Sequence, residues 1–266
     1  MSNTIDSELQ VLHTEWRKRI KEHFGDNAKF TWDGVVYKNG ELNDKTLESW
    51  IGTHRRVLFL LKDQNQPGTE KWDEDIRYWL KNIDKDDACH KNQKADNRNL
   101  KSPFICKLAF ILWGLSKIDK NNAWWPKQVE MHFEEVKAFF NTQPFALLEC
   151  KKVPGGGRVD DKMIKQHLTD YGDLLKREID ILKPNMIVCT SNLIHHFILQ
   201  TYPQNELISM DGHDGLHFHP KTGTFIFSSW HPSARKSCED IYEGIMYHYR
   251  LFLDQKVGDI INKLCY

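Results

Sequence analysis

The sequence lacks the features that mark several classes of protein. None of its apolar runs approaches the roughly 20 residues that cross a bilayer, and Met1–Asp6 has neither the basic nor the apolar part of a secretory signal. The six cysteines are scattered, with no Cys-x-x-Cys pair, which disfavours a cysteine-rich metal cluster and is typical of reduced thiols. We therefore expect a cytoplasmic protein without a membrane segment.

Net charge is also lacking, because 37 Lys and Arg residues balance 37 Asp and Glu residues. A neutral chain has no overall attraction to nucleic acid, so any contact with DNA would need a local basic face. Aromatic residues, in contrast, are numerous: nine Trp and 14 Phe predict a large aromatic core. With 40% apolar and 28% charged residues, the composition is that of a globular protein.

Four apolar runs alternate with helical patterns along the chain. The runs suit parallel strands that are buried on both faces, and they span residues 56–61, 144–152, 184–191 and 224–229. Amphipathic or fully apolar patterns predict helices at 7–24, 103–117, 127–140, 160–182, 191–200 and 237–264. This alternation predicts an α/β fold in which a central, mainly parallel four-stranded sheet lies between helices. We expect one domain over 1–266, with a core at 55–266 and an N-terminal elaboration at 1–54 made of a helix and a hairpin that turns at Asp33–Gly34.

Polar residues follow each predicted strand. Right-handed crossovers bring the carboxyl ends of parallel strands to one edge of the sheet, where ligands bind. We therefore expect the polar residues of the four strand ends to meet there: Asp63, Asn65, Glu149, Lys152, Ser191 and His231. Pro232 fixes one backbone angle beside His231, so this imidazole would be held on a stiff turn.

Three of these strand ends resemble the uracil-DNA glycosylase superfamily. Trp230-His231-Pro232-Ser233 is similar to the family's His-Pro-Ser motif, which lies against the flipped base and the minor groove of DNA. The polar loop that ends in Pro67-Gly68 stands where the family places its water-activating loop. Glu149-Cys150-Lys151-Lys152-Val153-Pro154 resembles the Asn-x-x-Lys-x-x-Pro pattern of some branches. The resemblance covers residues 55–235 and implies a three-layer α/β/α sandwich like that of the family.

The resemblance implies hydrolysis of the N-glycosidic bond of a damaged or deaminated base that is flipped out of DNA. Asp63 or Asn65 would orient a water molecule, and His231 would stabilise negative charge on the leaving base. The residues expected to bind the base are Gln64, Glu149, Ser191 and Phe104, with Trp72 as another stacking ring. The residues expected to hold the DNA backbone are Lys152, Ser233, Arg235 and Lys236. We expect a monomer that binds DNA and needs no metal and no cofactor.

Departures from the family pattern leave other functions open. Glu149 replaces the family's uracil-reading Asn, and a carboxylate cannot donate a hydrogen bond to uracil O4. Lys62 stands in place of a Gly, and Ala234 and Arg235 stand where the family often has an apolar wedge. The chain could therefore be a catalytically inactive protein of the same fold that binds nucleic acid or nucleotides. An enzyme acting on small nucleotides or nucleosides is a further possibility, because a fold alone does not identify a substrate.

A cluster of histidines offers a different chemistry. His213, Asp214, His217 and His219 have the spacing His-Asp-x-x-His-x-His, which could supply metal ligands. A metal-dependent hydrolase is the second alternative, and a His-rich surface loop before the last strand is the simpler interpretation of the same residues.

Overall fold

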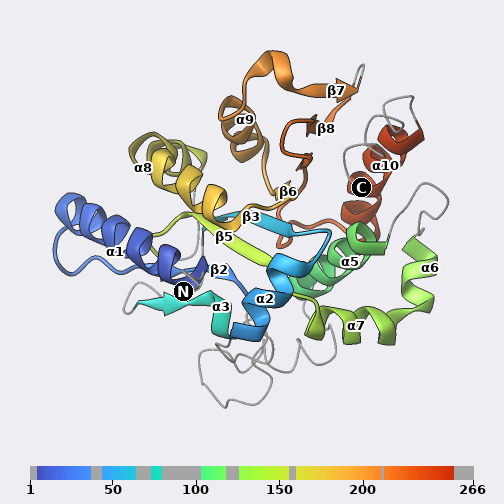
Figure 1. The fold of residues 1–266 in the computed structure, drawn as a ribbon, viewed down its shortest axis with the longest axis horizontal. Helices are drawn as coiled ribbons and strands as arrows, with labels where there is room; N and C mark the ends of the chain where they lie inside the picture. Colours follow the sequence, from blue (N-terminus) through green and yellow to red (C-terminus); the bar gives the residue numbers. More distant parts are fainter. Residues whose placement is uncertain are drawn as a thin grey trace.

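The computed structural model describes residues 5–36, 44–63, 73–79, 103–117, 126–155, 160–210 and 213–254. Figure 1 shows the course of the chain through its helices and strands. No helix among the described residues is long and apolar enough to span a bilayer.

The main sheet has seven strands in the order β2-β5-β3-β6-β9-β8-β7. The four central strands are parallel to their neighbours, and β2, β8 and β7 pair in antiparallel fashion. The strands, in chain order, are β2 Gly34–Val35, β3 Val57–Asp63, β5 Ala146–Lys151, β6 Met186–Cys189, β7 Ile208–Met210, β8 His213–His219 and β9 Thr224–Ser228. All four predicted strands are present, which confirms a mixed α/β fold with a mainly parallel sheet.

The predicted number of four strands was wrong, because three antiparallel strands extend the parallel core. β8 was not predicted because it is not a continuous apolar run. Leu216 and Phe218 alternate with His217 and His219, so one face is apolar and buried while the other carries imidazoles. β2 has only two residues, too few for a periodic signal.

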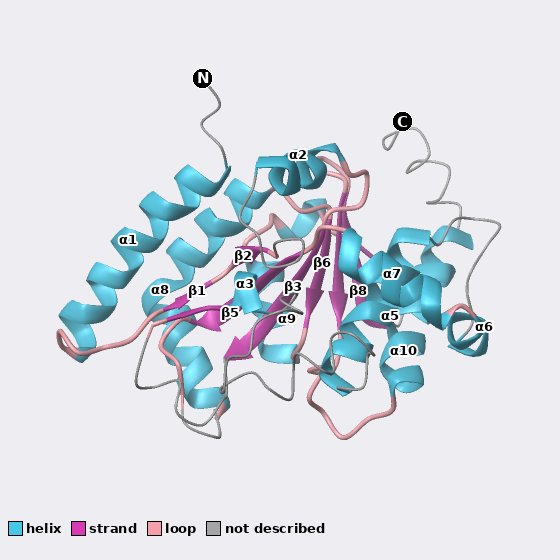
Figure 2. Cartoon of the chain, turned by 90° about the horizontal axis from the view of Figure 1, so that it is seen from below, coloured by secondary structure: helices cyan, strands magenta, loops and turns pink. Residues whose placement is uncertain are grey.

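Helices pack against both faces of the sheet, as Figure 2 shows with α1 and α8 on one side and α5, α7 and α10 on the other. Their bounds are α1 Ile5–Phe24, α2 Asp44–Gly52, α3 Ile76–Trp79, α5 Pro103–Lys117, α6 Pro126–Met131, α7 Phe133–Thr142, α8 Asp161–Leu182, α9 Asn192–Gln200 and α10 Cys238–Asp254. A short 3-10 helix spans Gln204–Glu206.

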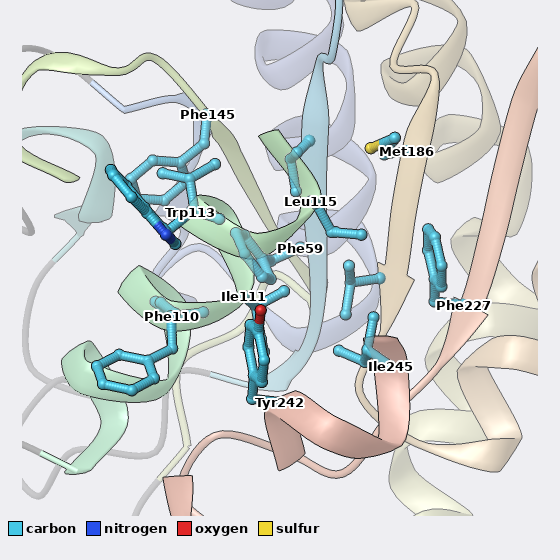
Figure 3. Close-up of a cluster of buried hydrophobic side chains, with 14 of the residues drawn as sticks. Phe59, Phe110, Ile111, Trp113, Leu115, Phe145, Met186, Phe227, Tyr242 and Ile245 are labelled. Carbon is cyan, nitrogen blue, oxygen red and sulfur yellow. The ribbon is translucent and has the colours of Figure 1, made fainter. Parts of the chain in front are cut away.

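Alternation along β3 divides the core into two apolar clusters. Phe59 belongs to the cluster that contains α5, α7 and α10 residues, whereas Leu58 and Leu60 belong to the cluster with α1, α8 and α9. Figure 3 shows the first cluster, in which Phe59 lies among side chains of α5 and α10. Burial on both faces explains why the central strands are apolar at nearly every position.

The helix ends follow the rules of capping. Asp160 accepts a hydrogen bond from the backbone N–H of Met163 at the start of α8, and Ser191 does the same for Ile194 at the start of α9. Gly25 ends α1 with a φ of 90°, a conformation that glycine adopts without strain.

The hairpin predicted at Asp33–Gly34 was wrong. The strand before the turn, β1 Thr31–Trp32, pairs in parallel with β4 Glu74–Asp75, and β2 after the turn pairs with β5 instead. The Asp33 side chain explains this path, because it is buried and accepts a hydrogen bond from the backbone N–H of Glu149 at 2.7 Å. The N-terminal segment is thereby joined to β5.

Candidate functional site

The four parallel strands end at one edge of the sheet, and β3 and β5 reach furthest. Asp63, the last residue of β3, is in register with Lys151 at the end of β5, whereas β6 already ends opposite Leu60. Along β5, Leu147 lies in the α5 cluster, so Glu149 and Lys151 lie on the same face by alternation. Asp63 shares this face with Leu61 for the same reason.

Two buried carboxyl groups, which we call the acid pair, lie on this face. Asp63 and Glu149 are 5% and 4% exposed. Asp63 Oδ2 accepts a hydrogen bond from Lys151 Nζ at 2.9 Å, and the backbone N–H of Gly155 also donates to this carboxylate. Asp63 Oδ1 and Glu149 Oε2 are buried and have no hydrogen-bond partner within the described part of the chain. Buried polar atoms are nearly always paired with protein or water, so these two oxygens are available to water or to a bound group.

Burial also changes the acidity of the pair. It raises the pKa of Asp63, an effect that Lys151 opposes. It raises the pKa of Glu149 well above its usual range, and the nearby charge of Asp63 raises that pKa further. Carboxyl groups whose pKa values are raised by burial are typical of catalytic and binding sites, although structural ion pairs also shift pKa values.

A turn over residues 231–237 follows β9 and lies against the first turns of α5. Lys107 on α5 is buried, and its Nζ donates to the carbonyl oxygens of Pro232 at 2.9 Å and Ala234 at 2.8 Å. The ring of Phe104, also on α5, lies with its centroid 6.3 Å from that of His231. α5 therefore fixes the turn and brings an aromatic ring to the histidine.

His231 is held in a defined protonation state. Burial lowers its pKa to about 4, and the charges of Lys62 and Lys107 contribute to the shift, so the imidazole is neutral near pH 7. Nδ1 accepts a hydrogen bond from the backbone N–H of Ser233 at 3.1 Å. The proton of the neutral ring is accordingly assigned to Nε2, which is left as a donor.

Exposed residues around this turn form what we call the basic rim. Trp230 is 60% exposed, and Lys236 Nζ lies 5.3 Å from the centroid of its ring. Ser233 and Arg235 are exposed beside them. An exposed aromatic ring with neighbouring cations is a surface that suits a nucleic-acid strand.

Lys152 is not part of this rim, which corrects its predicted role as a contact to the DNA backbone. Its side chain is fully buried on the opposite face of β5 from Lys151. The ammonium group is paired with Asp33 and with Glu178 Oε2, the latter at 2.8 Å, and lies 4.8 Å from the centroid of the Trp16 ring. It cannot reach a phosphate, because the sheet and α1 and α8 enclose it.

The group around Lys152, which we call the ion cluster, also contains His13. His13 Nε2 lies 2.5 Å from Glu178 Oε1 and 3.5 Å from Asp33 Oδ1. His13, Asp33 and Glu178 are the one set of three potential metal ligands within 4.8 Å of each other in the described residues. The Lys152 ammonium already pairs with both carboxyl groups of this set, so we interpret the ion cluster as structural.

The remaining predicted residues have mixed outcomes. Ser191 caps α9, with its Oγ 3.3 Å from the backbone N of Ile194, and its contact with a base stays a prediction. Gln64, Asn65 and Trp72 lie outside the described residues.

Among the described side chains of 213–219, the histidines do not gather into a metal site. His219 Nδ1 bonds to Thr222 Oγ1 at 2.8 Å, and its Nε2 bonds to Glu206 Oε2 at 3.1 Å. The ring of His217 faces His195 on α9 instead, at a centroid distance of 5.2 Å. The side chain of His213 is outside the described residues. This segment is strand β8, not a loop, and the rings of His217 and His219 have different partners although they lie on the same face of the strand.

Sequence reasoning missed Lys107, Lys151 and Gly155. A signal for Lys107 was present, because it is a single cation within the first three turns of a helix that is otherwise apolar. Lys151 and Gly155 gave none, since their contact with Asp63 depends on the pairing of β3 with β5.

No family model matches this chain, and no curated protein matches it either.

Proposed function

We propose that this chain hydrolyses the N-glycosidic bond of a damaged or deaminated base in DNA, as a divergent relative of the uracil-DNA glycosylases. In this proposal the parallel strands and their helices form a three-layer domain like that of the family. The protein acts as a cytoplasmic monomer without a metal or cofactor. The base is proposed to bind at the carboxyl ends of the parallel strands, with contacts to the acid pair, Phe104 and His231.

Asp63 is proposed to orient and activate the attacking water. Its Oδ1 is buried and free of hydrogen bonds from described residues, so it can accept one from water. Lys151 and the Gly155 N–H hold the other oxygen and fix the carboxylate. A raised pKa makes Asp63 a stronger base than a solvated aspartate, which favours proton abstraction.

Glu149 is proposed to read the edge of the base. The raised pKa favours its protonated form, and a protonated carboxyl group can donate a hydrogen bond as well as accept one. Glu149 could then donate to an exocyclic carbonyl oxygen of the base, as the amide of an Asn does in the related enzymes. A protonated Glu149 would therefore make the hydrogen bond that the family's Asn makes, which accounts for the main departure of the sequence from the family pattern.

His231 is proposed to stabilise the leaving base. Its Nε2–H is available because Nδ1 is occupied by the Ser233 N–H, and a neutral imidazole can donate to an oxygen that gains negative charge. Phe104 offers a ring on which the base can stack. The basic rim would contact the DNA strand, with Arg235 and Lys236 on phosphates.

The observation that carries the proposal is a pair of carboxyl oxygens, on Asp63 and Glu149, that have no hydrogen-bond partner among the described residues and lie on the face of the sheet that α5 covers. The test measures base release from single- and double-stranded oligonucleotides that contain uracil, hypoxanthine or xanthine, with undamaged DNA as the control substrate. We expect release of at least one of these bases. Intact glycosidic bonds on every substrate at high enzyme concentration would refute the proposed reaction.

A second candidate is a binding protein that has lost catalysis. The ion pair between Asp63 and Lys151 favours it, because a carboxylate that is already neutralised is a poorer base. The same oligonucleotides distinguish the two functions in a fluorescence anisotropy titration. Saturable binding without release of any base would support this second candidate.

A further inference from the structure

Two thiols meet beside the 231–237 turn. Cys106 lies on α5, next to Lys107, and Cys238 is the first residue of α10. Their Sγ atoms are 3.7 Å apart although 132 positions separate them in the sequence. Both side chains are half-buried, so a small oxidant can reach them. A disulfide bond of about 2.05 Å requires the sulfurs to approach by roughly 1.7 Å.

The surroundings make the two thiols unequal. The two thiols share a hydrogen bond, which lowers the pKa of Cys106 and raises that of Cys238. Lys107 also favours the Cys106 thiolate, whereas Glu239 and Glu130 oppose it. Since the thiolate is the reactive form, Cys106 is the nucleophile of the pair.

The other cysteines of the described residues are unlike this pair. Cys150 and Cys189 lie on the central strands, are at most 1% exposed, and have pKa values raised by burial. Buried thiols with raised pKa values are poor nucleophiles. Reactivity towards oxidants should therefore be concentrated at Cys106 and Cys238.

We propose that Cys106 and Cys238 form an oxidisable pair that peroxides convert into a disulfide. The Cys106 thiolate attacks one oxygen of the peroxide, the O–O bond breaks, and Cys106 becomes a sulfenic acid while the other oxygen leaves as water or alcohol. The Cys238 sulfur then attacks the sulfenyl sulfur, and the S–S bond forms with loss of water. With hydrogen peroxide, two thiols and one peroxide give one disulfide and two waters, and two electrons pass from sulfur to oxygen.

The disulfide would tie α5 to the start of α10, at the end of the turn that carries His231. In the reduced protein, Lys107 already holds this turn through two carbonyl oxygens. Oxidation adds a covalent link next to these bonds, so the turn becomes less mobile. This inference does not depend on the proposed function, because it concerns the thiols and the turn alone.

The test treats the full-length reduced protein with hydrogen peroxide at a few molar equivalents and maps its peptides by mass spectrometry. We expect a linked peptide pair that contains Cys106 and Cys238, and its disappearance after dithiothreitol. Cys106→Ser and Cys238→Ser should each abolish the link, while a Cys89→Ser/Cys265→Ser variant should keep it. Full alkylation of both thiols after treatment, or linkage of either one to a different cysteine, would overturn the assignment.

Hydrogen exchange tests the effect on the turn. We expect backbone amides of 231–237 to exchange more slowly in the oxidised protein than in the reduced one, with no such change in Cys238→Ser. Equal exchange rates in a protein that carries the Cys106–Cys238 link would refute the proposed tether.

Discussion

Removal of the Lys152 ammonium is expected to destabilise the folded protein strongly, because Lys152 has a structural role and does not contact DNA. Lys152→Met keeps an apolar side chain of similar length, but Asp33 and Glu178 lose the cation that pairs with both and Trp16 loses the ammonium group over its ring. Breaking a buried ion pair from one side costs about 3 to 5 kcal/mol, because the partner charge stays buried. For a protein of this size, that corresponds to a decrease in Tm of roughly 6 to 20 °C.

The loss should depend on pH in a defined direction. Burial and Glu178 raise the pKa of Asp33 to about 7, even with Lys152 opposing them. A raised carboxyl pKa contributes stability that is present below the unfolded pKa of about 3.9 and is lost as pH rises through the folded value. Without Lys152 the pKa of Asp33 rises further. The difference in unfolding free energy between wild type and Lys152→Met should therefore be smaller at pH 5 than at pH 8.

Urea unfolding followed by tryptophan fluorescence measures this difference at both pH values. Lys176→Met is the matched control, because Lys176 is exposed on α8 in an i,i+4 pair with Asp180, and such a change stays within about 0.5 kcal/mol. A loss below about 1 kcal/mol for Lys152→Met at pH 8, or a normal fold with weakened DNA binding alone, would refute the structural role of the ion cluster.

Three further changes test other parts of the structure. Lys107→Met removes two charged hydrogen bonds to backbone carbonyls and should lower the free energy of unfolding by about 2 to 4 kcal/mol in urea. Lys117→Met on the same helix is the control and should have little effect. Equal stability of the two variants would show that Lys107 does not hold the 231–237 turn. Gly155→Ala would place a Cβ 2.5 Å from Asp63 Oδ2, and this overpacking should lower the free energy of unfolding by about 1 to 3 kcal/mol. The loss would be visible as a lower Tm. An unchanged Tm would show that the backbone at Gly155 shifts without cost. His195 has its pKa lowered to about 4 by burial, so it contributes stability that is present above pH 6.5 and is lost as pH falls towards 4. His195→Gln should reduce this acid-induced loss of unfolding free energy by up to about 3 kcal/mol. His196→Gln, at an exposed position, is the control. Parallel curves of stability against pH for wild type and His195→Gln would contradict this role of His195.

The apolar pattern of the chain was enough to predict its central architecture. Continuous apolar runs gave all four parallel strands, because strands buried on both faces cannot be amphipathic. The apolar helix α5 and the capped helices α8 and α9 also carried local signals. β7 was missed because it is short, and the partner of β2 was wrong because β2 pairs with β5, which is distant in the sequence.

The candidate site was less predictable, because it depends on which face of a strand a residue occupies. Lys151 and Lys152 are adjacent, but one pairs with Asp63 and the other lies in the ion cluster on the opposite face. A one-residue change of register exchanges these roles, and the sequence alone does not fix the register. Asp33 was missed for a similar reason, since its partner Glu149 is 116 positions away.

The acid pair is the centre of this account, and single-turnover base release by an Asp63→Asn variant tests it most directly. The substrate is the oligonucleotide on which wild type is fastest, and the control is Asp180→Asn, whose carboxylate is exposed on α8. Asp63→Asn should be slower by about 10²- to 10⁴-fold, the usual contribution of a general base, while its far-UV circular dichroism and the rate of Asp180→Asn stay at the wild-type level. Release by Asp63→Asn at the wild-type rate would show that this carboxylate does not activate the water, and would contradict the account.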